Sequence, residues 1–243
     1  QSPIVKFLST EVLATIIDIT EHQRTRQKLE NALEEKTILL NEVHHRVKNN
    51  LQIISSLLNL QATHASDPRL RELLGESQSR VRAMALTHQL LYERKDYSRI
   101  DLGEYLERLG QLLRASCHWA RSRIALLRVL PTERQLVDFE RAISCGLVVN
   151  ELVTNSFKHA FPDGRAGEIR IELQASDAEL ILIVADNGTG LPENFDLATV
   201  RSLGLQLVPL LVEQIGGHFA IEARPGVRFA AHFPKDSPKG SST

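Results

Sequence analysis

"NELVTNSFKHAF", residues 150–161, is the stretch on which the fold of the second half of this chain depends. It belongs to a longer segment, 138–160, whose apolar residues recur at the spacing of an α-helix. Four polar residues within it lie four, three and one positions apart and therefore share one helix face: Glu151, Asn155, Lys158 and His159. Because such groups are costly to bury without partners, this face is either a solvated surface or a site for a polar ligand.

The segment "ADNGTGLP" (185–192) comes directly after a predicted buried strand, 179–186. Asp186, at the end of that strand, can accept a hydrogen bond from a flat ligand, while Gly188 and Gly190 let the ligand approach the backbone. The same residues are also typical of a tight turn, so this segment alone does not establish a binding site.

A third segment, "RSLGLQLV" (201–208), begins a predicted helix, 202–217. Gly204 stands near the start of this helix, where unpaired N–H groups face outward and phosphates bind. An ordinary helix cap explains the same pattern equally well.

In this order and spacing, the three segments resemble the N box and the two glycine boxes of the nucleotide-binding fold shared by DNA gyrase, mismatch-repair ATPases and sensor histidine kinases. The resemblance implies an α/β-sandwich domain that binds ATP with Mg²⁺. Asn155 would be the magnesium ligand and Glu151 would support the metal site, both as catalytic residues, while 192–202 would form a lid. The nucleotide-binding residues that the resemblance implies are Asn155, Lys158, His159, Asp186, Gly188, Gly190, Ser202, Leu203 and Gly204.

The elements around these segments predict a sheet with helices on one face. Apolar alternation and turn residues separate the predicted strands from the predicted helices. The predicted strands are 123–130, 168–176, 179–186, 218–223 and 228–233, and the predicted helices are 102–116, 138–160 and 202–217.

The first half of the chain has a different pattern. Apolar residues at heptad spacing predict one helix over 20–64, with a seam through Leu29, Leu33, Leu40, Val43 and Val47. Asp67 and Pro68 predict the start of a second helix, which again carries apolar residues at heptad spacing. Two long helices with a short connection form an antiparallel hairpin, and a single apolar stripe on each predicts a four-helix bundle with a second copy, that is, a homodimer.

Two adjacent histidines, His44 and His45, stand in "EVHHRVKNNLQ" (42–52) of the first helix. Three interpretations are open: surface residues without a role, ligands of a zinc site, or groups for covalent chemistry. No nearby cluster of cysteines or histidines completes a zinc site. The stretch resembles the phosphoacceptor hairpin of a sister group of the HWE histidine kinases, in which the acceptor precedes the arginine, here His45. The heptad pattern agrees, because it places His45 at the outermost position, where a neutral imidazole is a capable nucleophile near neutral pH.

Residues 12–19, "VLATIIDI", are β-branched and apolar and predict a strand. Together with "DIT" (18–20) they resemble the last strand and exit of a PAS sensor domain. The helix that follows, 21–37, would then be a coiled-coil signal helix; a plain amphipathic linker is the alternative.

Composition excludes some classes of function. The chain has 243 residues with 29 basic and 30 acidic side chains, which gives no electrostatic footprint for nucleic acid. No apolar run reaches the roughly 18 to 20 residues of a membrane span, so no membrane contact is predicted. The two cysteines, Cys117 and Cys145, have no metal or redox spacing and suit a reducing compartment. A cytoplasmic protein is therefore expected.

The sequence as a whole predicts an α+β protein: a phosphoacceptor hairpin followed by an ATP-binding domain. By the resemblance, it is a sensor histidine kinase core that phosphorylates His45 from Mg-ATP and passes the phosphoryl group to an aspartate of a response regulator receiver domain. The alternatives are a serine kinase of the anti-sigma type and an ATP-binding scaffold without histidine phosphorylation. The predicted segments are 1–20 (PAS edge), 21–37 (signal helix), 38–94 (hairpin), 95–234 (ATP-binding domain) and 235–243 (disordered tail).

Overall fold

The computed structural model describes residues 3–93, 99–115, 123–192, 203–223 and 225–235. The chain divides into two units, Gln1–Arg46 and Val47–Thr243, and each is described by itself. The predicted lid (192–202) and tail (235–243) lie outside the described residues, except for their first positions. Within the part that is described, no helix is both long and apolar enough to cross a membrane.

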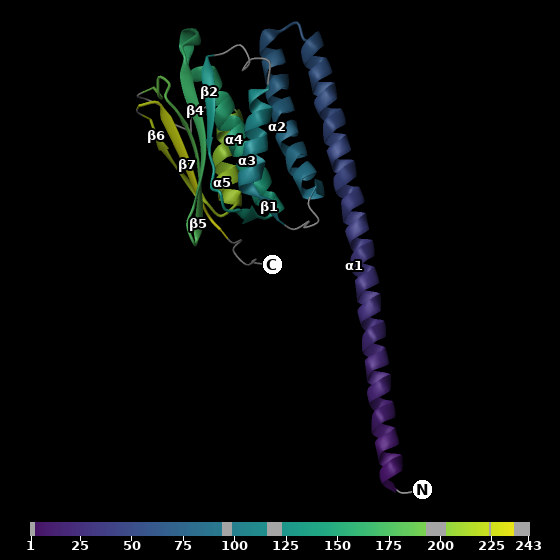
Figure 1. Ribbon diagram of the computed structural model, residues 1–243. Coiled ribbons are helices and arrows are strands. Elements are labelled where there is room, and N and C mark those ends of the chain that lie inside the picture. Colours follow the sequence, from purple (N-terminus) through teal and green to yellow (C-terminus); the bar gives the residue numbers. More distant parts are fainter. Residues whose placement is uncertain (1–2, 94–98, 116–122, 193–202, 224, 236–243) are drawn as a thin grey trace. The chain divides into compact units, whose positions relative to one another are not determined.

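The first unit is helical: α1 runs from Pro3 to His64 and therefore continues into the second unit (Figure 1). The prediction of a strand over 12–19 is wrong, because these residues lie inside α1. The physical reason is that a strand needs a neighbour to receive its backbone hydrogen bonds, whereas a helix forms them within itself. The predicted end of the helix at residue 64 is confirmed.

The second helix, α2, spans Pro68–Glu93 and begins where the sequence predicts. The carboxylate of Asp67 accepts a hydrogen bond of 2.9 Å from the backbone N–H of Arg69, which caps the helix. Gln78 of α2 donates a hydrogen bond of 3.1 Å to the carbonyl of Ser55 in α1. Within the second unit, the part of α1 that follows Arg46 and the whole of α2 thus form the predicted antiparallel hairpin.

The rest of the second unit is built on a five-stranded sheet in the order β2-β4-β5-β7-β6. β2 is parallel to β4, and the other pairs are antiparallel. All five predicted strands are confirmed, and their bounds are β2 Ile124–Val129, β4 Gly167–Ala175, β5 Glu179–Asp186, β6 His218–Glu222 and β7 Val227–Pro234.

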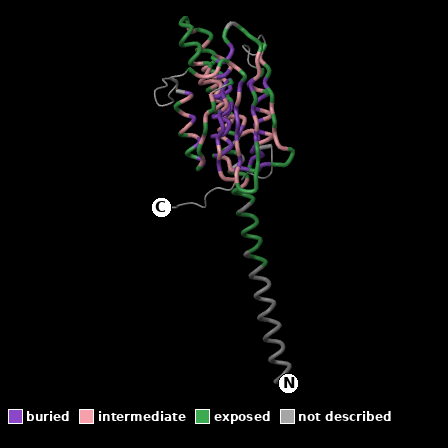
Figure 2. Tube along the Cα trace, turned by 90° about the vertical axis from the view of Figure 1, so that its left-hand side faces the viewer, coloured by how far each residue is buried: buried purple, intermediate pink, exposed green. Residues whose placement is uncertain are grey.

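Three helices cover one face of this sheet: α3 (Leu102–Arg114), α4 (Phe139–His159) and α5 (Leu203–Gln214) (Figure 1). The core lies between the sheet and these helices, where Figure 2 shows the buried residues gathered. Alternation explains this on β4, whose Ile169 and Ile171 are fully buried while the residue between them is exposed. The predicted α/β sandwich is therefore confirmed.

Helix α2 also packs against this domain, because it lies against α3 and α4. The buried hydroxyl of Tyr105 in α3 donates a hydrogen bond of 3.2 Å to the carbonyl of Ala83 in α2. The contact belongs to the second unit, so α2 is part of the same compact body as the sheet.

The sequence did not predict a small ladder in which β1 (Ile100–Asp101) pairs with β3 (Leu136–Val137), nor the 3₁₀ turn Pro162–Gly164. Two-residue strands are too short to show a periodic pattern. This ladder ties the start of α3 to the segment that precedes α4.

Candidate functional site

The polar face of α4 is held in place by a capped helix start. The carboxylate of Asp138 accepts a hydrogen bond of 2.9 Å from the backbone N–H of Arg141. Along the helix, Glu151 is buried, Asn155 and Lys158 are half-buried, and His159 is exposed. The face is thus not a uniformly solvated surface, because burial increases from its C-terminal end toward Glu151.

Asp186 lies at the end of β5 and is only 8% exposed. One carboxylate oxygen, Oδ2, accepts a hydrogen bond of 2.7 Å from the hydroxyl of Ser156 in α4. The other, Oδ1, accepts hydrogen bonds from the backbone N–H groups of Gly188 at 2.9 Å and Val227 at 3.3 Å. A carboxylate has about four acceptor positions, so Asp186 can still accept a bond from a ligand.

The three predicted glycines contact the protein itself. A Cβ added at Gly188 would collide with Ala160, which follows the last residue of α4. Gly190 has a positive φ of 78°, which residues with a side chain rarely adopt. A Cβ at Gly204 would collide with the carboxylate of Glu151. The backbone around Gly188 and Gly190 therefore already requires glycine at these two positions, whether or not a ligand approaches them, whereas a side chain at Gly204 would require the Glu151 carboxylate to shift.

Glu151 is paired with a residue of α2. Its two carboxylate oxygens accept hydrogen bonds of 2.8 Å each from Nε and Nη2 of Arg80, and the two side chains are only 7% and 14% exposed. The Asn150 amide adds a third bond of 3.0 Å to the same carboxylate. The hydrogen bond to Glu151 raises the pKa of Arg80 above its ordinary value, although burial opposes the shift.

Lys158 is also paired with α2, but its partners there are acids, whereas the partner of Glu151 is a cation. Its ammonium lies 2.6 Å from a carboxylate oxygen of Glu72 and 2.5 Å from one of Glu76. Burial alone would lower the pKa of Lys158, but the hydrogen bonds to the two carboxylates raise it. The bond from Lys158 in turn lowers the pKa of Glu72.

Asn155 lies between Glu151 and Lys158 along the same face of α4. Its Nδ2 atom is buried and has no hydrogen-bond partner among the described residues. A buried polar atom without a partner costs free energy, so this N–H donor is available for an acceptor atom of a ligand.

The other predicted site residues are placed less fully. His45 is exposed on α1 in the first unit, and Arg46 beside it pairs with Glu42 at 2.7 Å. Exposure does not single out His45, because Val43 on the predicted seam is 55% exposed as well. Leu203 begins α5, whereas Ser202 and the side chain of His44 lie outside the described residues.

Sequence reasoning missed four residues that shape the site: Ser156, which binds Asp186, and Glu72, Glu76 and Arg80 of α2. A signal existed for α2, since these three residues are spaced four apart and share one helix face. Their partners, however, lie more than seventy positions away in the chain. Only tertiary structure connects them.

Comparison with known families accounts for both halves of the chain. Residues 42–117 match the family model described as histidine kinase, and residues 141–237 match that of the histidine kinase-, DNA gyrase B- and HSP90-like ATPases. The chain carries the two domains of a histidine kinase. The order of the two histidine kinase domains is the one that the sequence predicts.

Individual relatives agree with this assignment. The chain is 38% identical over 198 residues to the sensor histidine kinase PdtaS of Mycobacterium tuberculosis, covering 81% of this chain and 38% of that protein. It is 30% identical over 191 residues to blue-light-activated histidine kinase 2 of Erythrobacter litoralis, covering 75% and 52%. The chain thus spans about half or less of the length of these relatives.

A solved structure shares the architecture. The blue-light activated histidine kinase of Erythrobacter litoralis superposes with a TM-score of 0.61 at 28% identity, covering 79% of this chain and 57% of that one. The helical region followed by an α/β ATPase domain is therefore the fold of a solved histidine kinase.

The residues present in the ATPase domain fit ATP with Mg²⁺. Asp186 keeps an acceptor position for an adenine amino group, and the buried Nδ2 of Asn155, which has no partner among the described residues, can donate a hydrogen bond to a phosphate oxygen. The amide oxygen of Asn155, supported by Glu151, would hold Mg²⁺, whose chemistry when bound is to neutralise charge on the phosphates. Glu151 and Lys158 differ from the other two residues because helix α2 already occupies them.

Proposed function

We propose that this chain is the core of a sensor histidine kinase that phosphorylates its own His45 from Mg-ATP. One observation carries the proposal: a histidine kinase region containing His45 and an ATPase domain containing Asn155 and Asp186 occur in one chain, in that order. A serine kinase of the anti-sigma type would not need the first region, and a scaffold with a silent nucleotide domain would not need Asn155, Asp186 and Gly204.

The chemistry follows from the groups present. The unprotonated ring nitrogen of His45 attacks the γ-phosphorus of ATP, so that an N–P bond forms and the P–O bond to ADP breaks. The ADP oxygen leaves with the electron pair, and the ring loses its remaining proton to water. The protein's part in such a transfer is to position the phosphates and stabilise their charge, which we assign to Asn155, Lys158 and His159, with Ser202, Leu203 and Gly204 beside them.

The phosphoryl group then passes to an aspartate of a response regulator receiver domain. We further propose that an upstream sensor of PAS type supplies the signal, in a cytoplasmic protein. The sensor rests on the sequence resemblance of residues 1–20 alone, since helix α1 replaces the strand that this resemblance implies.

A homodimer is proposed because both helices of the hairpin present apolar side chains to solvent. Leu29 and Val43 of the predicted seam are 70% and 55% exposed in the first unit. In the hairpin part of the second unit, exposed apolar residues are Ile53, Ile54, Leu57, Leu60, Leu70 and Leu73. A second hairpin would remove this surface from water, which is the usual driving force for a four-helix bundle.

The test is autophosphorylation with labelled ATP and Mg²⁺ on the wild type, His45→Ala and His44→Ala. We expect acid-labile, base-stable label on the wild type and on His44→Ala, and none on His45→Ala. Label lost only in His44→Ala would move the acceptor site by one residue. A wild type that binds ATP but is never labelled on histidine would contradict the kinase proposal and favour the scaffold.

A further inference from the structure

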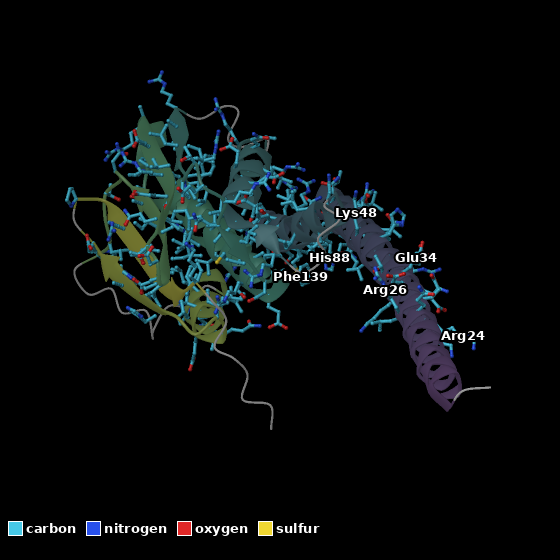
Figure 3. The ribbon with its side chains drawn as sticks, turned by 60° about the horizontal axis from the view of Figure 1, so that its bottom comes forward. Arg24, Arg26, Glu34, Lys48, His88 and Phe139 are labelled. Atoms are coloured by element: carbon cyan, nitrogen blue, oxygen red, sulfur yellow. The ribbon has the colours of Figure 1, made fainter. Side chains whose placement is uncertain are left out.

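Helices α2 and α4 run antiparallel and meet along one face of each. At one end, the ring of His88 in α2 lies 4.7 Å from that of Phe139 at the start of α4, an edge-to-face contact (Figure 3). Farther along, Ser79 donates a hydrogen bond of 2.5 Å to Asn150. The contact continues to Lys158 in the last turn of α4, so α2 follows α4 over most of its length.

Three charged residues of α2 pair with two of α4 at the nucleotide end of this contact. We call Glu72, Glu76 and Arg80 together with Glu151 and Lys158 the α2–α4 clamp. The cation of α2, Arg80, forms an ion pair with the acid of α4, Glu151. The two acids of α2 form ion pairs with the cation of α4, Lys158. Glu76 joins the two halves, because it also lies 3.6 Å from Arg80.

We propose that the α2–α4 clamp is an autoinhibitory contact that Mg-ATP must displace in order to bind. The proposal rests on the proposed function, in which Lys158 approaches the phosphates and Glu151 supports the metal. Both residues are occupied by α2 in this structure, so the nucleotide competes with α2 for them.

Electrostatics makes the two states exclusive. The carboxylates of Glu72 and Glu76 form ion pairs with the ammonium of Lys158. A triphosphate bound to the same ammonium would be repelled by these two negative charges at close range. The guanidinium of Arg80 covers both oxygens of Glu151, and its positive charge repels a divalent cation there. Each charge on α2 thus has the sign that opposes the ligand expected at its α4 partner.

The contact has the strength that a switch requires. The Arg80–Glu151 pair is bidentate and almost buried, which favours good geometry and resists screening by salt. Glu72, by contrast, is 56% exposed, so water can replace its bond to Lys158 at small cost. The clamp can therefore open from its Glu72 end, and by linkage any signal that moves α2 changes the affinity for ATP.

The test is the affinity of the full chain for Mg-ATP, measured by calorimetry, in Glu72→Gln/Glu76→Gln and in Arg80→Met. We expect each variant to bind Mg-ATP about tenfold more tightly than the wild type, within the usual range of coupling between sites. The matched controls are Glu213→Gln, an exposed acid of α5, and Arg82→Met, an exposed arginine of α2; both should stay within about twofold.

Arg80→Met separates the clamp from a simple charge effect. Removing a cation near an anionic ligand weakens binding if only charge matters, whereas opening a clamp strengthens it. Unchanged or weaker binding in either test variant overturns the proposal. Since Arg80→Met leaves a nearly buried acid unpaired, its fold is checked by circular dichroism, and Glu72→Gln/Glu76→Gln keeps the test valid if Arg80→Met unfolds.

A second readout follows the movement of α2 itself. In a Cys117→Ser background, Ser79→Cys should react with a maleimide faster when Mg-ATP is added, whereas Ser56→Cys on α1 should not change. An unchanged or slower rate at Ser79→Cys contradicts the clamp. If neither the wild type nor any variant binds ATP, the proposed function itself fails. If all the proteins bind ATP equally and His45 is labelled, only the proposal of the clamp fails.

Discussion

The two ends of the candidate nucleotide site are built differently. At the adenine end, Asp186 is fixed by Ser156 and by two backbone N–H groups of its own domain. At the proposed phosphate end, Glu151 and Lys158 are fixed by side chains of α2, the second helix of the hairpin. The first end is therefore preformed by the ATPase fold, whereas the second depends on where a neighbouring helix lies.

This difference separates specificity from control. The backbone donors of Gly188 and Val227 cannot move without disrupting the end of β5 and the start of β7, so a base bound at Asp186 would meet the same acceptor in every state. Side-chain ion pairs across two helices can be exchanged for bonds to a ligand, so binding at Glu151 and Lys158 can be regulated. The predictions below test this contrast, from the largest expected effect to the smallest.

The largest effect is expected at the preformed end. Asp186→Asn removes the charge that accepts three protein hydrogen bonds and replaces one acceptor oxygen with a donor. A hydrogen bond to a charged group contributes about 1.5–3 kcal/mol, so we expect ATP affinity to fall about a hundredfold. Equilibrium binding of ATP measures this, with the exposed turn residue Asp177→Asn as the control. Affinity within threefold of the wild type would remove Asp186 from the site.

Gly204→Ala tests the packing between the two ends. The added Cβ collides with the carboxylate of Glu151 while that carboxylate is held by Arg80. We expect the free energy of unfolding in urea to fall by about 1–3 kcal/mol, the usual cost of overpacking.

The matched control for this packing test is Gly75→Ala within α2, where the added Cβ has no atom within 4 Å apart from the neighbouring backbone of its own helix. Alanine in a helix interior is favoured over glycine by about 1 kcal/mol, so this variant should be stabilised. A Gly204→Ala protein as stable as the wild type would mean that Glu151 moves without cost.

The stability that the ion pairs of Lys158 contribute at the phosphate end should depend on pH. The pKa of Glu72 is lowered by Lys158, so its stabilising contribution is present above its ordinary pKa and is lost as the pH falls through the lowered value. The pKa of Lys158 is raised, so its contribution is present below its ordinary value and is lost as the pH rises through the raised one.

Urea unfolding as a function of pH measures this dependence. The wild type should lose stability below about pH 4 and again above about pH 10.5, near the reference pKa values of glutamate and lysine. Glu72→Gln/Glu76→Gln should flatten both limbs relative to the wild type, by no more than about 1 kcal/mol because Glu72 is exposed. Parallel curves for the two proteins would show that the Lys158 pairs carry no stability.

The smallest effect is expected from an ion pair outside both ends. Arg46 and Glu42 form an exposed pair on α1, with side chains 74% and 55% exposed. Glu42→Gln should change the stability of the folded chain by less than about 0.5 kcal/mol. Thermal unfolding followed by circular dichroism checks this, and a larger loss would mean that Glu42 has a partner beyond Arg46.

Much of the fold was predictable because its signals are local. Asp67 is the helix cap that the sequence predicts, and the alternation of β4 and the apolar run of β5 place their apolar residues in the core. The strand predicted over 12–19 failed for a reason that is equally physical: β-branched residues favour a strand only where other strands are present to pair with it.

The site was predictable to the level of α4 and β5, but not of its partners. The spacing of Glu151, Asn155 and Lys158 on one helix face is a property of the sequence. That Asp186 is held by Ser156, and that Gly188 packs closely against Ala160, required the packing of β5 against α4.

The sequence by itself determined the two domains, their order, the helix caps and the polar face of α4, because each depends on residues close together in the chain. Only the tertiary structure decided that α2 pairs with Glu151 and Lys158. The charges of Glu72, Glu76 and Arg80 are visible in the sequence, but solvent, a second copy of the chain or α4 could equally have received them. Their partners are chosen by the packing of two helices that the chain separates by more than forty residues.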